Sequence, residues 1–279
     1  MSSPFQFKYI HKLSGRRVLI LGGTSGVGYA VAEALLEHSA HVIISGSNPT
    51  SVSRTLDRLR ATPGGQGLSQ NRGRGGGGAA TLSGKECDLS DPSTLEANLR
   101  ELFLFATAEG TEKLDHVVFT AGDSLNNGPL SGVTPDDITK ALVVRFTAPI
   151  MVAKLFPEFV NVSHESSLTL TGGSTSMRPV AGWVVAAGVG AGLEGAMRVM
   201  AVELAPVRVN LVALGAVRTE LFGKMGDGFE EWLEKFRLEE TLTKTIGKPE
   251  DAAEAYLYCM KDHLIDGTIV RTDGGRLLA

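Results

Sequence analysis

Residues 17–28 of the chain read RVLILGGTSGVG, from Arg17 to Gly28. The apolar run that ends at Leu21 predicts a strand, and the amphipathic pattern of residues 27–37 predicts a helix directly after the glycine-rich turn. A second apolar run at residues 41–45 completes a βαβ unit, in which two parallel strands flank one helix. This unit is the building block of a doubly wound parallel sheet, so it sets the expected fold class as α/β.

The turn between this strand and this helix has the properties of a dinucleotide-binding site. Its glycines allow a tight turn, close approach of a pyrophosphate and close packing of the helix on the strand. The first helical turn also presents unpaired N–H groups and the positive end of the helix dipole. A glycine-rich turn without a ligand is the alternative. We predict cofactor contacts from Gly22, Thr24, Ser25, Gly26, Val27 and Gly28.

Five further apolar runs lie at residues 80–87, 116–120, 167–171, 208–211 and 268–271, and helical patterns separate them. Seven strands alternating with helices are typical of a Rossmann-type doubly wound parallel sheet. The chain has 279 residues, of which 43% are hydrophobic, so it suits one large domain better than two. We predict a single domain over residues 15–279, preceded by an N-terminal extension of residues 1–14.

Residues 63–78 read PGGQGLSQNRGRGGGG and interrupt this pattern. Half of them are glycine and Leu68 is the single apolar side chain other than proline, so burial cannot offset the entropy lost on ordering. We therefore predict a flexible insertion over this segment. Arg72 and Arg74 resemble the arginines of RNA-binding glycine-rich segments, although a tolerated surface insertion is the favoured interpretation.

Composition excludes several classes of partner. The net charge of −4 and a pI of about 5.9 argue against nucleic acid and membrane surfaces and favour a small-molecule substrate. The N-terminus lacks an apolar signal core, and no run of ~18 or more apolar residues is present, so we predict a cytoplasmic protein. Cys87 and Cys259 lack metal-ligand spacing, which favours two reduced core thiols and no metal site.

The end of the second predicted strand distinguishes the two nicotinamide cofactors. An acidic residue there would accept hydrogen bonds from a ribose 2′-hydroxyl and repel a 2′-phosphate. The segment from Ser45 to Asn48 has no acid, so we predict NADP(H), with phosphate contacts from Ser47, Asn48 and Arg54. Arg54 on an exposed helix face is equally compatible with a solvated side chain.

Residues after the third predicted strand suggest an adenine contact. Asp88 can accept a hydrogen bond from the exocyclic amine, with Leu89 beside it. The alternative for Asp88 is a helix N-cap, a role for which Ser90 and Asp91 compete.

Later motifs extend this pattern to the end of the chain. Thr120-Ala121-Gly122 follows the fourth apolar run, and Arg208-Val209-Asn210, GAVRT at 215–219 and TDGG at 272–275 come after it. With the glycine turn and Asp88, this ordered set resembles the short-chain dehydrogenase/reductase family. The resemblance implies a Rossmann fold, a nicotinamide cofactor and further cofactor contacts from Thr120, Ala121, Gly122, Gly215, Val217 and Thr219.

The resemblance fails at the residues that carry the family's usual chemistry. That chemistry uses Asn, Ser, Tyr and Lys, with the tyrosine as proton donor to a carbonyl oxygen. The corresponding positions here are Arg145, Gly173 (with Ser174 next to it), Ala186 and Gly190. Tyrosine occurs only at positions 9, 29, 256 and 258, and no lysine lies between 154 and 224. We therefore predict that tyrosine-driven carbonyl reduction is lost.

A divergent fungal branch of the family offers a replacement chemistry. Arg178-Pro179 and Trp183 resemble the bifunctional reductase and Diels–Alder cyclase enzymes of the malbrancheamide and paraherquamide type of alkaloid pathway. That resemblance implies hydride transfer from NADPH to a cationic iminium, which needs no proton donor, and an acid near the Arg-Pro pair. Met177 occupies the position of that acid in this chain.

Five residues are candidates for the altered site. Arg145 interrupts an apolar helical face, where a charge must be paired or line a cleft. Asp123 follows the fourth strand, is the only acid near the expected nicotinamide pocket, and could pair with Arg145 or Arg178. The alternative for Arg145 is a structural ion pair, and for Asp123 it is a turn residue that caps the following segment. Arg178 could instead be a surface loop residue, and Trp183 could instead fill the core. The catalytic set that we predict is Arg145, Asp123, Ser174, Arg178 and Trp183.

The resemblance also implies a substrate lid and self-association. Phe222 and Met225 fall in the family's lid segment, and Trp232 and Phe236 continue it, with a packing role as the alternative. The long apolar helices at residues 132–156 and 183–204 imply a homodimer or homotetramer. The predicted function is an NADPH-dependent reductase of fungal alkaloid-type metabolism, acting on a preactivated C=N or C=C and coupled to cyclisation. The alternatives are a non-redox cyclase or isomerase and a catalytically silent binding protein.

Overall fold

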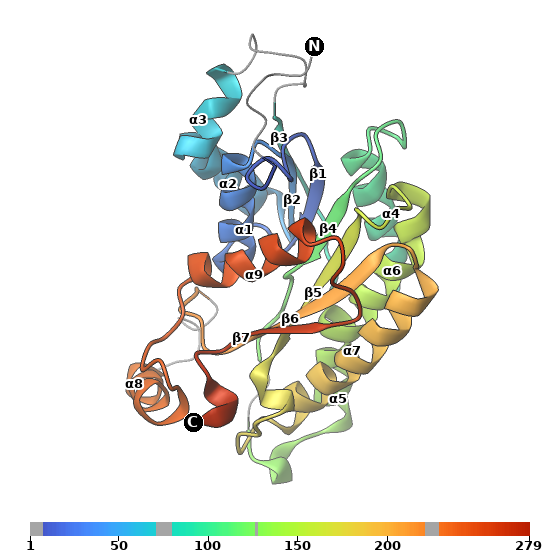
Figure 1. Cartoon of the computed structure of the whole chain (residues 1–279). Helices are drawn as coiled ribbons and strands as arrows, with labels where there is room; N and C mark the ends of the chain where they lie inside the picture. Colours follow the sequence, from blue (N-terminus) through green and yellow to red (C-terminus); the bar gives the residue numbers. More distant parts are fainter. Residues whose placement is uncertain (1–7, 71–79, 126–127, 221–228) are drawn as a thin grey trace.

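All seven predicted strands form one parallel sheet. The structure, a computed structural model, describes residues 8–70, 80–125, 128–220 and 229–279. The sheet order is β3-β2-β1-β4-β5-β6-β7, and every neighbouring pair is parallel (Figure 1). The strands are β1 (Arg17–Leu21), β2 (His41–Gly46), β3 (Leu82–Glu86), β4 (His116–Phe119), β5 (Ser167–Gly173), β6 (Arg208–Leu214) and β7 (Ile269–Thr272).

Helices cover both faces of this sheet (Figure 1). The first face carries α1 (Gly26–Glu37) and α9 (Pro249–Lys261), with α2 (Pro49–Ala61) and α3 (Pro63–Gln70) beside them. The second face carries α4 (Leu95–Ala106), α6 (Ala148–Phe159) and α7 (Val184–Glu203). Two further helices, α5 (Pro135–Leu142) and α8 (Phe229–Glu240), lie toward the carboxyl ends of the strands.

The alternation of side chains along β1 explains the two cores. Leu19 and Leu21 belong to the cluster under α4, α6 and α7, whereas Val18 and Ile20 belong to the cluster under α1 and α9. All four side chains are fully buried, as expected for a central parallel strand covered on both faces. The chain leaves β1 toward β2 on one side and returns to β4 on the other, which creates the switch point where such sheets bind ligands.

The last residues of the predicted N-terminal extension belong to the domain. Leu13 is 1% exposed and packs in the cluster that covers α1 and α9, so the domain begins before residue 15. Apolar periodicity could not reveal this, because a single apolar side chain in a polar segment carries no period.

The prediction of a flexible loop is wrong over residues 63–70, which form α3. This helix packs against α1 and α2, and glycines make the close approach possible. A Cβ atom on Gly65 would lie 1.9 Å from the carbonyl oxygen of Leu59, and one on Gly64 would lie 2.9 Å from the nitrogen of Glu37. Glycines therefore allow the close packing of α3. The other residues of the predicted loop, 71–78, lie outside the described residues.

Helix α7 has the length and composition of a membrane-spanning helix, which the sequence did not lead us to expect. Its 20 residues are long and apolar enough to cross a membrane by length and composition. It nevertheless packs on β5 and β6, with Leu193 and Met197 inside the core cluster. Packing on the sheet explains the buried side of this helix, whereas Val184, Val199 and Val202 stay exposed on its other side.

We expect alanine substitutions at two glycines of α3 to have opposite effects on stability. Gly65→Ala should lower the free energy of unfolding by ~1–3 kcal/mol, because its Cβ would overlap the Leu59 carbonyl oxygen. Gly67→Ala is the matched control, since nothing lies within 4 Å of a Cβ there, and it should stabilise the protein slightly. Urea denaturation of both variants measures the difference, and equal midpoints would contradict the packing of α3.

Candidate active site

The glycine turn after β1 has no room for side chains at Gly22 and Gly28. Gly22 has a φ of +86°, and a Cβ atom on it would lie 2.5 Å from the nitrogen of Ala121. A Cβ atom on Gly28 would lie 2.2 Å from the oxygen of Gly22 and 2.4 Å from Oγ1 of Thr120. The Thr120 hydroxyl donates to the carbonyl oxygen of Leu21 at 3.0 Å. The turn therefore lies directly on the end of β4 and fits a dinucleotide pyrophosphate.

Segments from distant parts of the sequence surround this turn. Ser25 is the N-cap of α1 and makes no side-chain capping bond. Thr24 contacts Gly46 at the end of β2, where a Cβ would meet it at 2.5 Å. Thr219 lies over Gly26, with its Cβ 3.2 Å from the position of a Cβ there. The structure thus brings residues 24–28, 120–122 and 215–219 to one edge of the sheet.

The segment 215–219 reaches this edge through main-chain contacts. Gly215 donates its N–H to the oxygen of Thr272 at 3.0 Å, and a Cβ on Gly215 would lie 2.7 Å from Cα of Asp273. Val217 is buried and pairs with Gly247 in an isolated bridge. Val27 and Leu89 are buried hydrophobic residues, so their contribution to the cofactor site is limited to backbone atoms and apolar walls.

The end of β2 is open and carries no acid. Ser47, Asn48 and Arg54 are exposed. Asn48 is the N-cap of α2, and its Oδ1 accepts from the N–H of Ser51 at 2.9 Å. The N-terminus of α2 therefore adds its dipole to these polar groups, which suits a phosphate.

Asp88 does not cap the following helix. Helix α4 begins at Leu95 with Thr94 as its N-cap, so the capping alternative for Asp88 is wrong. Oδ1 of Asp88 instead accepts from the N–H and the hydroxyl of Ser90, at 2.9 and 2.7 Å. This turn holds the Asp88 carboxylate after the carboxyl end of β3, where the sequence predicts the adenine contact.

Asp123 and Arg145 form the ion pair that the sequence suggested. Nε of Arg145 lies 2.9 Å from Oδ1 of Asp123, and its Nη2 donates to the main-chain oxygen of the same residue. The guanidinium lies against Gly122, where a Cβ would approach its atoms to 2.8 Å. The Arg145 and Asp123 side chains stay 26% and 39% exposed, so a substrate can still reach the pair.

Local backbone geometry aims Arg145 at this edge. Residues Val143–Thr147 form one turn of π-helix between α5 and α6. Such single π turns are rare and frequent at functional sites, because the extra residue rotates one side chain out of the helical register. Arg145 is the polar residue that this turn redirects away from the apolar face that covers the sheet.

Arg178 does not pair with Asp123. Its Nε lies 3.2 Å from Oε2 of Glu240, and its Nη1 donates to the main-chain oxygens of Arg276 and Ala279. Ser174 is 7% exposed, and its Oγ accepts from Nη1 of Arg276 at 3.2 Å. The structure thus separates Ser174 and Arg178 from the Asp123–Arg145 pair and joins them to the C-terminal segment.

The predicted aromatic residues have different surroundings. Trp183 is half-buried and stands at the N-cap of α7. Trp232 and Phe236 stack within α8 with ring centroids 5.1 Å apart. Phe222 and Met225 lie outside the described residues. Only the α8 part of the predicted lid can therefore be placed.

No tyrosine occupies the usual donor position. Ala186 and Gly190 are half-buried on α7, and a Cβ on Gly190 would meet nothing within 4 Å. Tyr256 lies on α9, where burial raises the pKa of its hydroxyl and Thr171 bonds it at 2.7 Å. Burial also raises the pKa of Cys87 to about 12, so its thiol stays protonated.

Two further acids, Glu220 and Glu194, make contacts that the sequence did not indicate. Oε2 of Glu220 accepts from the N–H of Gly26 at 3.0 Å, at the start of α1. Glu194 is 8% exposed on α7 and accepts from the hydroxyl of Ser176. Local pattern could not find these acids because the contacting residues are far apart in the chain. Met177, at the position of the expected acid, is 42% exposed, and Nη2 of Arg271 lies 3.1 Å from its sulfur.

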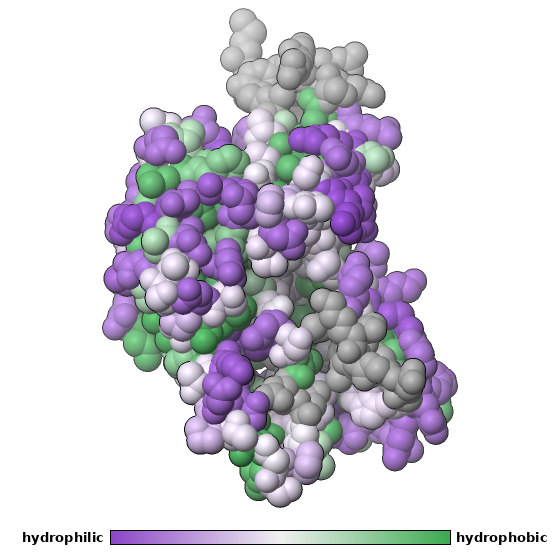
Figure 2. Space-filling model, turned by 180° about the vertical axis from the view of Figure 1, so that it is seen from behind, coloured by the Kyte–Doolittle hydropathy of each residue, from purple (hydrophilic) through white to green (hydrophobic). Residues whose placement is uncertain are grey.

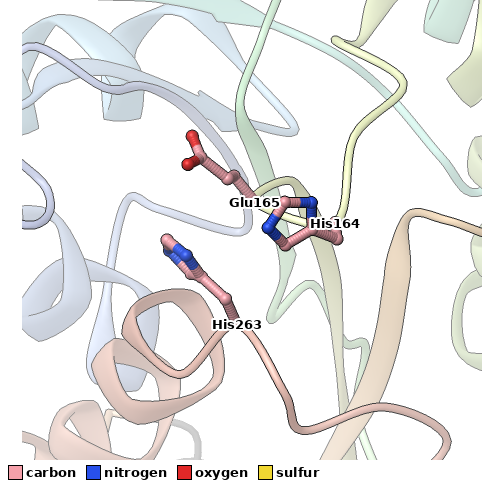
Figure 3. Close-up of side chains that lie close together, drawn as sticks. All are labelled: His164, Glu165 and His263. Carbon is pink, nitrogen blue, oxygen red and sulfur yellow. The ribbon is translucent and has the colours of Figure 1, made fainter.

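A second cluster of polar side chains lies at the opposite end of the sheet. His164, Glu165 and His263 point toward one another with all candidate ligand atoms within 4.8 Å (Figure 3). Spacing in the sequence did not indicate this cluster. Arg16, however, already pairs with Glu165 at 2.6 Å, and its positive charge opposes a bound cation. We assign no metal to it.

Comparison with known proteins places this site in context. The family model described as SDR-like Rossmann domain matches residues 9–279. The short-chain dehydrogenase/reductase malC of Malbranchea aurantiaca is 43% identical over 267 residues, with 95% of this chain and 96% of that protein covered. The solved structure of MalC reductase/Diels-Alderase has a TM-score of 0.86 and covers 97% of this chain and 99% of that one. The short-chain dehydrogenase/reductase fsr5 of Gibberella fujikuroi is 39% identical over 274 residues, 98% of each chain.

We expect Glu220 to weaken cofactor binding, because its carboxylate occupies an N–H at the helix terminus that suits a pyrophosphate. Glu220→Gln should therefore lower the dissociation constant for NADPH by roughly twofold to fivefold. Glu230→Gln, at an exposed position of α8, is the control and should leave it unchanged. Fluorescence titration measures both constants. Weaker or unaltered NADPH binding by the Glu220 variant would contradict this role.

Proposed function

Because the chain belongs to the short-chain dehydrogenase/reductase family, we propose that it is an NADPH-dependent reductase of a preactivated C=N or C=C bond. One observation carries this proposal. The dinucleotide turn is intact, whereas the positions of the tyrosine and lysine hold Ala186 and Gly190, and a charged pair, Asp123 and Arg145, faces the same edge. Bound NADPH would supply the hydride.

The chemistry follows from what the site lacks. A ketone needs a proton on oxygen as hydride arrives, and no tyrosine stands at the donor position. An iminium carbon accepts hydride and becomes a neutral amine, so this substrate needs no proton. The carboxylate of Asp123 stabilises such a cation, while Arg145 holds the carboxylate in place.

The residues around the glycine turn would hold the cofactor. The N–H groups at the start of α1 suit the pyrophosphate, and Ser47, Asn48 and Arg54 suit the 2′-phosphate. Asp88 suits the adenine amine. Residues 120–122 and 215–219 lie beside the glycine turn at the same edge of the sheet and would flank the nicotinamide half of the cofactor.

A coupled cyclisation is part of the proposal. MalC of Malbranchea aurantiaca is described as a reductase/Diels-Alderase, and the likeness extends over nearly the whole of both chains. We propose that the region around Asp123 and Arg145 also folds a reduced alkaloid-type product for a pericyclic ring closure. The non-redox alternative is less favoured because the similar MalC is described as a reductase as well as a Diels-Alderase.

A second copy of the chain would cover the face of α5 and α7. An apolar groove of about 310 Å³ lies between these helices, with Val133, Leu142 and Phe146 in its lining. Val184, Val199 and Val202 are exposed on α7, and Figure 2 shows hydrophobic surface gathered on the side of α4 to α7. We therefore propose a homo-oligomer.

Two free, buried cysteines suit the reducing conditions of the cytoplasm, which we propose as the location of the protein.

Cofactor preference tests the first half of this proposal. NADPH should bind at least about tenfold more tightly than NADH, because polar and cationic groups at the end of β2 face the 2′-phosphate without a carboxylate. Ser47→Asp should reverse this preference by repelling the phosphate and accepting from the ribose hydroxyl. Fluorescence titration with both nucleotides measures it. Equal affinities in the unaltered protein would contradict the proposal.

Reduction of cyclic imines tests the second half. Arg145→Ala should slow NADPH oxidation with 1-pyrroline or 3,4-dihydroisoquinoline by about a hundredfold, since it leaves Asp123 without its partner. Lys140→Ala is the control, because that lysine forms only an exposed pair with Asp136 on α5. Product analysis should accompany the rate measurement. An Arg145 variant with the original rate and products would remove the pair from the site.

A further inference from the structure

A cavity lies at the amino-terminal edge of the sheet, opposite the glycine turn. It has a volume of about 660 Å³, and its wall combines the segment before β1, the residue before β4 and the loop after α9. None of its lining residues belongs to the cofactor or substrate site described above, so its chemistry needs a separate explanation. The lining is mostly basic and includes Lys8, His11, Lys12, Arg16, Asp115 and His263.

Asp115 is the single acid in this lining, and donors within the wall already satisfy its carboxylate. Oδ1 accepts from Nη1 of Arg16 at 3.2 Å and from Asn161 at 3.1 Å, and Oδ2 accepts from the N–H of Arg17 at 2.8 Å. Nη2 of Arg16 pairs with Glu165 at 2.6 Å, outside the lining. Arg16 therefore offsets the acids on this side of the cavity rather than serving a ligand.

Lys8 and Lys12 are the cations that remain for a ligand. Among the residues that the structure describes, no carboxylate forms an ion pair with either ammonium. Nζ of Lys12 donates to the main-chain oxygen of Lys261 at 2.8 Å, which anchors it at the end of α9 and uses one of its three N–H bonds. Nζ of Lys8 lies 5.8 Å from the ring centroid of Tyr9. Both ammonium groups can therefore donate to an anion in the cavity.

The charge of the lining is opposite in sign to that of the whole chain. The chain has a net charge of −4, whereas the lining has two lysines and an arginine against one acid. Asp262 lies nearby but outside the lining. The hydrogen bond from the N–H of Leu264, at 3.0 Å, lowers the pKa of Asp262, and the charge of Lys12 adds to this effect. The cavity is thus a local attractor for anions on an acidic protein.

A histidine extends the set of donors across the cavity. His263 is half-buried and stands edge to face with His164, with ring centroids 6.0 Å apart (Figure 3). An imidazole N–H can donate in the neutral ring as well as in the charged one. Lysine binds phosphate as a compact point charge, and ligand cavities of roughly 300–1,000 Å³ hold small organic molecules. Charge and size together therefore suit a phosphorylated small molecule.

We propose that this cavity is a binding site for the phosphate groups of a small phosphorylated molecule. Lys8 and Lys12 are its principal ligands, and His263 supplies a further N–H donor. The site is independent of the proposed function, because it lies at the edge of the sheet opposite the glycine turn. A ligand bound here would join the segment before β1 to the loop after α9.

Calorimetric titration with inorganic pyrophosphate at constant ionic strength tests this site. The protein is first saturated with NADPH, so that the glycine turn is occupied. One equivalent of pyrophosphate should then bind with a dissociation constant below about 1 mM. Absence of binding in this range would overturn the proposal.

Substitutions that remove one charge test the two lysines. Lys8→Gln and Lys12→Gln should each raise the dissociation constant at least about threefold, because glutamine keeps an N–H donor but loses the charge. Lys235→Gln is the matched control, since it removes the same charge from α8, where Lys235 pairs with Glu239. Equal constants in all of these proteins would overturn the proposal. If NADPH does not bind, only the proposed function fails, and the lysine variants still report on this cavity.

Lysine acetylation locates the bound anion without any substitution. Pyrophosphate should slow the acetylation of Lys8 and Lys12 by N-hydroxysuccinimidyl acetate at least about threefold, while Lys140 and Lys235 keep their rates. Mass spectrometry of the peptides measures all four rates. Equal protection of the four lysines, or protection of none, would overturn the assignment to this cavity.

Discussion

At the carboxyl end of β1, the backbone of Gly22 lies on the backbone of Ala121 with no space for a side chain between them. Gly28 closes the same contact from the first turn of α1, against Thr120. This approach of two strand ends joins the halves of the sheet at their switch point. It also turns the N–H groups of α1 toward the cleft, so the fold and the anion site depend on the same missing Cβ atoms.

Two groups of charged side chains lie at the same edge of the sheet as the contact between Gly22 and Ala121. Asp123 leaves the end of β4, and a π turn brings Arg145 to it from the helix that covers the sheet. A second group, Arg178, Arg276 and Glu240, connects the end of β5 with α8. The two groups do not share a partner. One is the charged pair of the proposed site, and the other ties the end of α8 to the segments after β5 and β7.

The loss of the tyrosine and lysine changes which substrates the site can serve. A half-buried Ala186 and Gly190 leave space on α7 where a proton donor and its partner would stand. The retained acid–base element is an ion pair whose carboxylate stays accessible. An accessible carboxylate suits a positive charge better than a developing alkoxide, and the proposed function rests on this difference.

The sequence alone determined the seven strands, their parallel order around the glycine turn and the family, because hydrophobic period and turn glycines are local properties. It also indicated the pairing of Asp123 with Arg145. Tertiary structure decided what local pattern cannot encode. Leu13 joins the core, residues 63–70 pack as a helix, Arg178 turns to Glu240, and Glu220 reaches Gly26 across the chain. Each of these depends on contacts between distant residues, and only the folded chain brings those residues together.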